Sequence, residues 1–170
     1  MRMEGMKRAI AGGVETIEHG DGGTLEIFKT MKAKGIGYCP TLAAGDAISQ
    51  YRGWDKANDP DPKRIIQKKA SFKLALQSGV PIVFGGDVGV FTHGKNYLEM
   101  ELMVAYGMQP LEVLKSATSG NAKMFHLNQL GNLKEGYLAD IIAIKGNPLK
   151  DMGTMKNVSF VMKDGKVYKR

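Results

Sequence analysis

A short β-strand that runs into a glycine-rich loop is encoded by residues 15–23, ETIEHGDGG. A helix is expected to follow and to run to about Lys34, because apolar residues recur there at three- and four-residue spacing, and Thr24 is its candidate cap. Gly35 ends this helix, since glycine readily adopts the positive φ of a helix C-terminus. Residues 36–39, IGYC, are expected to form a second strand. The order strand, helix, strand is typical of a parallel α/β fold.

The same alternation continues on both sides of this unit. Residues 4–11 have the pattern of the end of a helix, and residues 42–62 are expected to form a loop rich in Gly, Asp, Asn and Pro. A helix with one apolar face is expected over residues 63–78, followed by the apolar strand 81–84, PIVF. Short, nearly continuous apolar strands between helices indicate a parallel sheet that helices cover.

The pattern changes after Gly94, where three helices and then three strands are expected. Thr118 and Ser119 are the expected caps of the third helix, and Asp164-Gly165 is a signal for a two-residue hairpin. The chain therefore ends in a small antiparallel sheet. The helices span about residues 95–106, 110–117 and 120–126, and the strands about 141–145, 159–163 and 166–169.

Composition excludes several classes of protein. Hydrophobic residues make up 43% and charged residues 24% of 170, as in an ordinary globular domain, and the single cysteine excludes a disulfide framework. The net charge is +7, and residues 145–170 hold seven basic against two acidic residues. These basic residues alternate with apolar ones, which is typical of strands with a solvated face. We therefore expect no nucleic-acid partner, and no membrane partner because no apolar run is long enough to span a bilayer.

His19 and Asp87 are the strongest candidates for chemistry. Each follows the end of a predicted strand and has glycine neighbours, and functional side chains gather at such ends of parallel strands. Imidazole and carboxylate are ligands that zinc hydrolases use to activate water, and a carboxylate can pass a proton to a leaving nitrogen. For each residue alone, a hydrogen-bonded structural role remains open. Two ligands are fewer than the three that a catalytic zinc normally takes.

Three other residues are weaker candidates. His93 lies in the loop 91–94 on the same side as Asp87 and is a candidate substrate contact, with an ordinary surface position as the alternative. His126 falls at a helix end, where interaction with the helix dipole explains it. Cys39 precedes a proline at a strand end and is expected to be a small buried hydrophobic residue.

Several segments together resemble the metal-dependent amidohydrolase superfamily. Residues 9–20, AIAGGVETIEHG, resemble its sixth-strand segment, and residues 85–89, GGDVG, resemble its eighth-strand segment. Residues 114–122 and 131–142 resemble the closing part, which leads from the barrel into a small β-sandwich. The motifs follow the expected order along the whole chain.

The resemblance is strongest to the branch that contains Xaa-Pro dipeptidases and amidohydrolases related to imidazolonepropionase, through residues 38–42 and 84–94. It implies an α/β fold that is the C-terminal part of a (β/α)8 TIM-like metal-dependent hydrolase barrel, followed by a small β-sandwich tail, with the N-terminal strands missing. Residues 1–128 would hold the last three βα units and the C-terminal helices. Residues 129–170 would form part of the β-sandwich.

The resemblance also implies roles for the two strand-end residues. His19 matches the sixth-strand histidine that binds metal, and Asp87 matches the eighth-strand aspartate that binds metal and shuttles a proton. The sequence has no His-x-His pair, no lysine at the fourth-strand position and no fifth-strand histidine. The expected cofactor is a divalent metal, zinc being the first choice, in a site that is incomplete here.

The expected function follows from the same resemblance. The chain is expected to be a C-terminal fragment of a metal-dependent hydrolase. This hydrolase would cleave a carbon–nitrogen bond in an Xaa-Pro dipeptide, another peptide-like molecule or an N-acyl amino acid. The isolated chain is expected to be inactive. The alternative is a truncated, non-catalytic chain, or a half-barrel that needs a missing N-terminal half or a second copy as its partner. The cytoplasm is the default compartment, although a missing segment could have carried a signal peptide.

Overall fold

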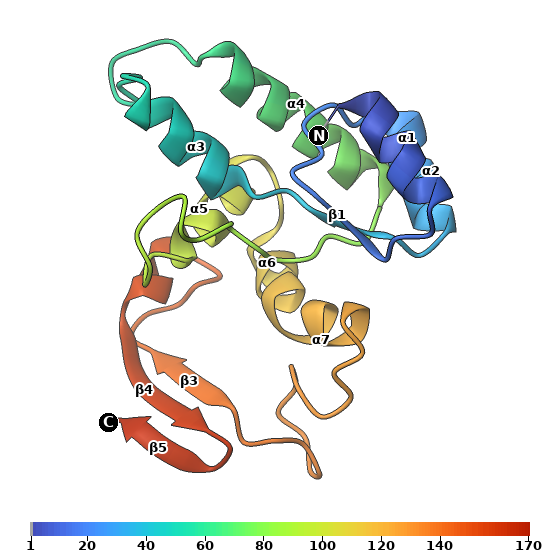
Figure 1. Cartoon of the computed structure of the whole chain (residues 1–170). Helices are drawn as coiled ribbons and strands as arrows, with labels where there is room; N and C mark the ends of the chain where they lie inside the picture. The colour runs from blue at the N-terminus through green and yellow to red at the C-terminus, as the bar shows by residue number, and fades with distance from the viewer. Residues whose placement is uncertain (1) are drawn as a thin grey trace.

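A small parallel sheet lies at the centre of the computed structural model, which describes residues 2–170 (Figure 1). Strands β1 (Thr16–Glu18) and β2 (Gly37–Cys39) pair in parallel, as the sequence predicts. The predicted strand at 81–84 joins them through a single parallel bridge between Tyr38 and Ile82. This third segment is therefore extended backbone at the edge of β2, less regular than predicted.

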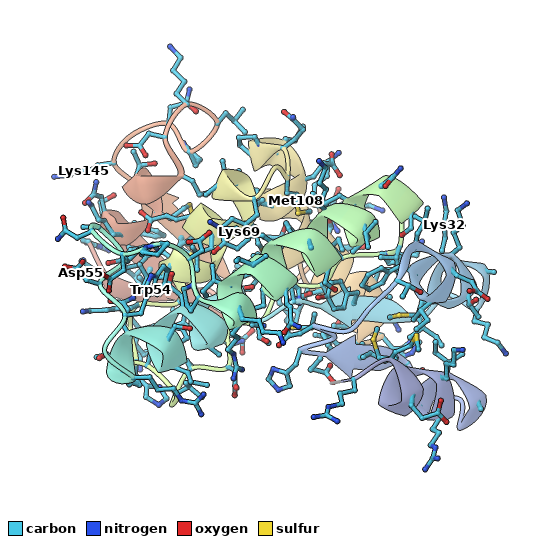
Figure 2. The ribbon with its side chains drawn as sticks, turned by 90° about the horizontal axis from the view of Figure 1, so that it is seen from above. Lys32, Trp54, Asp55, Lys69, Met108 and Lys145 are labelled. Carbon is cyan, nitrogen blue, oxygen red and sulfur yellow. The ribbon has the colours of Figure 1, made fainter. Side chains whose placement is uncertain are left out.

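Helices surround this sheet and follow it along the chain. The confirmed helices begin and end close to their predicted positions: α1 (Met3–Ala11), α2 (Leu25–Ala33), α4 (Lys63–Ser78) and α5 (Tyr97–Ala105). The Thr24 hydroxyl accepts a hydrogen bond from the amide of Ile27, so it caps α2 as expected. Seen from above, α4 crosses the molecule from the loop that holds Trp54 to the side where Lys32 lies (Figure 2).

The predicted loop over residues 42–62 was wrong for its first half. Residues Leu42–Tyr51 form helix α3, and only the remainder, with Trp54, is a connection. Gly45 and Asp46 suggested a loop, but both are buried on α3. A Cβ at Gly45 would lie 2.2 Å from the Cε atom of Lys68, so the glycine is needed for packing between α3 and α4.

The predicted break before residue 120 was also wrong. Helix α6 (Pro110–Lys115) continues through a π-helical turn, η1 (Ser116–Gly120), directly into α7 (Asn121–Met124). Thr118 caps nothing; its hydroxyl donates to the carbonyl of Leu114 one turn earlier. Such back-bonding is an alternative to capping for a threonine within a helix.

The C-terminal part forms a separate antiparallel sheet that joins the rest of the chain through a 3₁₀ turn. The strands and turn span Ile141–Ile144 (β3), Met152–Lys156 (η2), Val158–Lys163 (β4) and Lys166–Lys169 (β5). The strands pair in the order β3-β4-β5, and the Asp164-Gly165 turn has positive φ at both positions, 50° and 75°, which is the conformation expected for this hairpin. The sheet contacts α5 through η2, and Met152 of this turn is buried in the main core.

The core lies between the central strands and the helices around them. The rings of Phe28 and Tyr38 are fully or nearly fully buried, with centroids 4.8 Å apart. Within residues 2–170, no helix has the length and hydrophobicity to cross a bilayer.

Candidate metal site at the strand ends

His19 and Asp87 lie together at the carboxyl ends of the central strands. His19 directly follows β1, and Asp87 follows the extended segment that pairs with β2. The His19 Nε2 and Asp87 Oδ2 atoms are 4.0 Å apart, and each side chain is 44% exposed. The two candidates are therefore close neighbours on one edge of the sheet, although their role as metal ligands stays a prediction.

The backbone at this edge is strained. His19, Thr41 and Asp87 have positive φ values of 71°, 47° and 60°, which residues other than glycine rarely adopt. The amide of His19 is held by a hydrogen bond of 2.9 Å to the carbonyl of Cys39. Strain of this kind persists where the fold fixes it, and it gathers at functional sites.

The two side chains are close to the separation that a shared ion requires. Two ligands of a tetrahedral zinc ion, each bonded at about 2.1 Å, lie about 3.4 Å apart, so the 4.0 Å between His19 Nε2 and Asp87 Oδ2 would have to shorten by roughly 0.6 Å. Within residues 2–170, no group of three or more histidine, cysteine, aspartate or glutamate side chains is arranged to hold a metal. The pair thus fits part of a catalytic metal site, and further ligands are required.

Lys68, which the sequence analysis missed, is a buried charge beneath this edge of the sheet. Its side chain is 1% exposed, and its Nζ donates to the Asp21 carboxylate at 2.8 Å and to the Pro40 carbonyl at 3.1 Å. These bonds fasten α4 to the loop after β1 and to the end of β2. One signal was available, because Lys68 shares the buried face of α4 with Ile65 and Phe72.

Glu99 is a second buried charge that was missed. This residue of α5 is fully buried, and its two carboxylate oxygens accept from the amides of Leu42 and Ala43 at 2.8 and 2.6 Å. Burial raises the pKa of Glu99 to about 7, while the two amides and the charge of Lys68 favour the ionised form. Nothing in the sequence near Glu99 indicates that its carboxylate accepts hydrogen bonds from the first two amides of α3.

The weaker candidates lie in different surroundings. Cys39 is buried as expected, and burial raises the pKa of its thiol to about 12. His93 is in an exposed loop, and the structure does not add it to the pair as a third metal ligand. The His126 Nε2 lies 2.9 Å from the Glu15 carboxylate, so its direct partner is a side chain.

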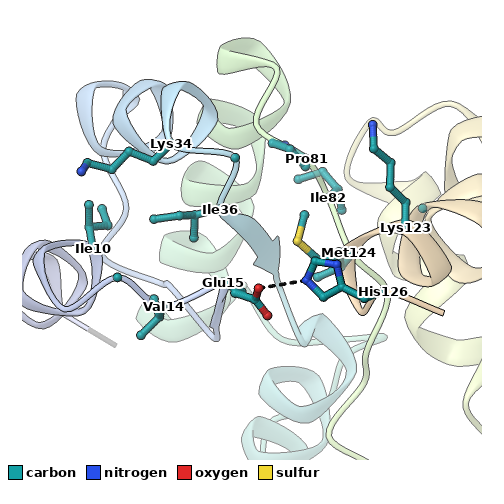
Figure 3. A pocket seen from close by; sticks show the side chains of 14 residues that line it. Ile10, Val14, Glu15, Lys34, Ile36, Pro81, Ile82, Lys123, Met124 and His126 are labelled. Atoms are coloured by element: carbon teal, nitrogen blue, oxygen red, sulfur yellow. Dashed lines mark hydrogen bonds and ion pairs between the residues drawn. The ribbon is translucent and has the colours of Figure 1, made fainter. Parts of the chain in front are cut away.

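His126 and Glu15 belong to the opposite edge of the sheet. They line a cavity of about 640 Å³ together with Ile36, Ile82 and Met124 (Figure 3). Glu15 precedes β1 and Ile36 precedes β2, so this cavity opens at the amino ends of the strands. It is separate from the edge that carries His19 and Asp87.

Gly20 provides a test of the packing beneath His19. A Cβ at this position would lie 2.4 Å from the Cε2 atom of Tyr38, and φ is already positive. Gly20→Ala is expected to lower the free energy of unfolding by about 2 kcal/mol or more, measured by urea denaturation. Gly13→Ala is the matched control, because φ is also positive there but nothing lies within 4 Å. Equal losses in the two variants would contradict the close contact with Tyr38.

Fold and site together define an α/β protein with a candidate metal site at the carboxyl edge of a parallel sheet. The sequence profile of the Amidohydrolase family matches residues 3–168. The ochratoxinase of Aspergillus niger is 33% identical over 175 residues, which cover 97% of this chain and 36% of the ochratoxinase.

Solved structures show the same similarity. A crystal structure of a Xaa-Pro dipeptidase with bound methionine in the active site has a TM-score of 0.88 at 39% identity, over 98% of this chain and 43% of that chain. The crystal structure of A. niger ochratoxinase has a TM-score of 0.82 at 31% identity, over 98% and 39% of the two chains. The chain belongs to the amidohydrolase family, and it spans about two-fifths of the length of these relatives.

Proposed function

We propose that this chain is part of a metal-dependent amidohydrolase that hydrolyses a carbon–nitrogen bond. The observation that carries the proposal is the pair formed by His19 and Asp87, 4.0 Å apart at the carboxyl edge of the sheet. Membership of the amidohydrolase family supports hydrolysis. The similarity to a Xaa-Pro dipeptidase favours a peptide-like substrate, an Xaa-Pro dipeptide or an N-acyl amino acid.

The proposal extends to the architecture. β1, β2 and the segment 81–84 would be the last three strands of a (β/α)8 barrel, with residues 1–128 in the barrel. Residues 129–170, which contain the antiparallel sheet, would be part of a small β-sandwich. In this arrangement the carboxyl edge of the sheet is the catalytic face, as in other barrels of this type.

Each of the two side chains has a defined task in this mechanism. His19 and Asp87 would hold a divalent metal, for which we propose zinc, and when bound it supplies Lewis-acid activation of the attacking water. Asp87 accepts the proton that the water loses and delivers it to the leaving nitrogen. The half-exposed position of both side chains leaves room for substrate to approach.

A second candidate function follows from the number of ligands. At the carboxyl edge of the sheet the described residues bring two candidate donors together, one fewer than a catalytic zinc site takes. The alternative is a non-catalytic chain, or one that gains its remaining ligands from a second copy or from a separate chain. We propose a partner of this kind, and neither nucleic acid nor membrane.

Hydrolysis of a substrate panel separates a chain that completes a hydrolase together with a partner from a non-catalytic chain. The chain is incubated with Zn²⁺ and either Xaa-Pro dipeptides or N-acyl amino acids, alone and with an N-terminal segment of a related dipeptidase that supplies further ligands. Release of free amino acid is expected only with the segment present, and Asp87→Asn should abolish it. No release with any metal or segment would overturn the hydrolase proposal and favour the non-catalytic chain.

A further inference from the structure

A line of hydrogen bonds leads to His19 from the end of β2. The His19 Nδ1 atom lies 2.7 Å from the Thr41 hydroxyl oxygen. The same hydroxyl donates to the carbonyl of Pro40 at 2.8 Å. A threonine hydroxyl has one hydrogen to donate, so toward His19 its oxygen acts as an acceptor. The ring must then carry its hydrogen on Nδ1.

This tautomer determines which nitrogen of His19 is free. In neutral imidazole only one ring nitrogen carries a hydrogen, so a protonated Nδ1 leaves Nε2 with its lone pair. Nε2 is the atom that lies 4.0 Å from the Asp87 carboxylate. The contact with Thr41 therefore prepares His19 to bind a metal through the nitrogen that faces Asp87.

Thr41 holds its position at an energetic cost. It is buried and left-handed, with φ 47° and ψ 51°, a conformation that is strained for a β-branched residue. The next two amides, of Leu42 and Ala43, both donate to the fully buried carboxylate of Glu99. Glu99 thus fixes the backbone immediately after Thr41, and it comes from a helix more than fifty residues away.

We propose that Thr41 is a positioning residue that sets the tautomer and direction of His19, and that Glu99 holds Thr41 in the required conformation. The inference deepens the proposed function and rests on it, because the proposed function supplies the metal that the free Nε2 of His19 would bind. A merely structural threonine would stabilise the loop without determining the hydrogen on the ring. The two roles are distinguished by which ring nitrogen of His19 carries the hydrogen.

The test is nitrogen NMR of the histidine rings in the ¹⁵N-labelled full chain, without metal and at a pH well above the ordinary histidine pKa. The chain has three histidines, so few ring signals need assignment. His19 is expected to carry its hydrogen on Nδ1. Finding it on Nε2 in the unmodified chain overturns the proposal without any variant.

Variants at Thr41 separate the hydroxyl from the shape of the side chain. Thr41→Val keeps the shape and is expected to lose the Nδ1 preference, whereas Thr41→Ser keeps the hydroxyl and is expected to keep it. Thr92→Val is the matched control, because Thr92 is exposed in the loop beside His93. A Thr41→Val chain that folds and retains the tautomer overturns the proposal, as does a folded Thr41→Ser chain that loses it.

Glu99→Gln tests the second half of the inference. One oxygen becomes an NH₂ group that cannot accept, so one of the two amides loses its partner. We expect His19 to lose part of its Nδ1 preference while circular dichroism shows a folded chain. A folded Glu99→Gln chain with an unchanged His19 ring would overturn the role of Glu99.

Metal titration keeps this inference separate from the proposed function. With the ligand-supplying segment present, Thr41→Val is expected to weaken Zn²⁺ binding about 10- to 100-fold relative to the unmodified chain, measured by calorimetry, and Thr41→Ser much less. If the unmodified chain shows the expected tautomer but binds no Zn²⁺ even with the ligand-supplying segment, the metal proposal fails and the positioning role stands. If Zn²⁺ binds equally to Thr41→Val and to the unmodified chain, the positioning role fails and the metal proposal stands.

Discussion

Asp87→Asn is expected to lower kcat at least about 100-fold in any preparation of this protein that hydrolyses an amide. Asparagine keeps the size of the side chain and one oxygen that can face a metal, but it loses the charge and the ability to accept a proton. KM is expected to change much less, because the lost interaction belongs to the transition state. The measurements are steady-state kinetics and metal content by mass spectrometry.

The control for this variant is Asp164→Asn. Asp164 also has a positive φ, 50°, but it lies in the hairpin between β4 and β5, away from the site. The Asp164→Asn variant should leave kcat unchanged.

His19→Ala is expected to lower metal content first, with activity partly recovered by excess divalent metal. The catalytic role of Asp87 would be contradicted by near-normal turnover in Asp87→Asn with its metal in place.

Lys68→Ala is expected to lower the free energy of unfolding by about 3 kcal/mol or more. The side chain is 1% exposed, and its removal leaves the partly buried Asp21 carboxylate without its cation. The Pro40 carbonyl loses its donor as well, and the side-chain carbons that pack over Gly45 leave a cavity. Urea denaturation followed by circular dichroism measures the loss.

Lys73→Ala on the same helix is the matched control. Lys73 is exposed on α4, so its replacement should change stability by no more than about 0.5 kcal/mol. The comparison removes the contribution of helix propensity, because both variants exchange lysine for alanine within α4. If Lys68→Ala costs as little as Lys73→Ala, the buried ion pair does not hold the strand ends together.

Local pattern was sufficient for much of the fold. Helix α4 has the predicted bounds because its buried face repeats at helical spacing and Gly79 ends it with a φ of 69°. Helix α3 was missed because its start depends on Glu99, which is 56 and 57 positions from the amides that it binds. The π-helical turn was missed because threonine and serine indicate a cap as readily as a position within a helix.

The sequence by itself determined the alternation of strands and helices and the positions of His19 and Asp87 at strand ends. Both depend on neighbours along the chain, on apolar periodicity and on glycines that permit a turn. Only the tertiary structure decided that His19 Nε2 faces Asp87, that Thr41 meets Nδ1, and that Lys68 and Glu99 are buried beneath them. The physical reason is that a buried charge or a strained residue is stable only with partners, and here those partners come from segments far apart in the chain.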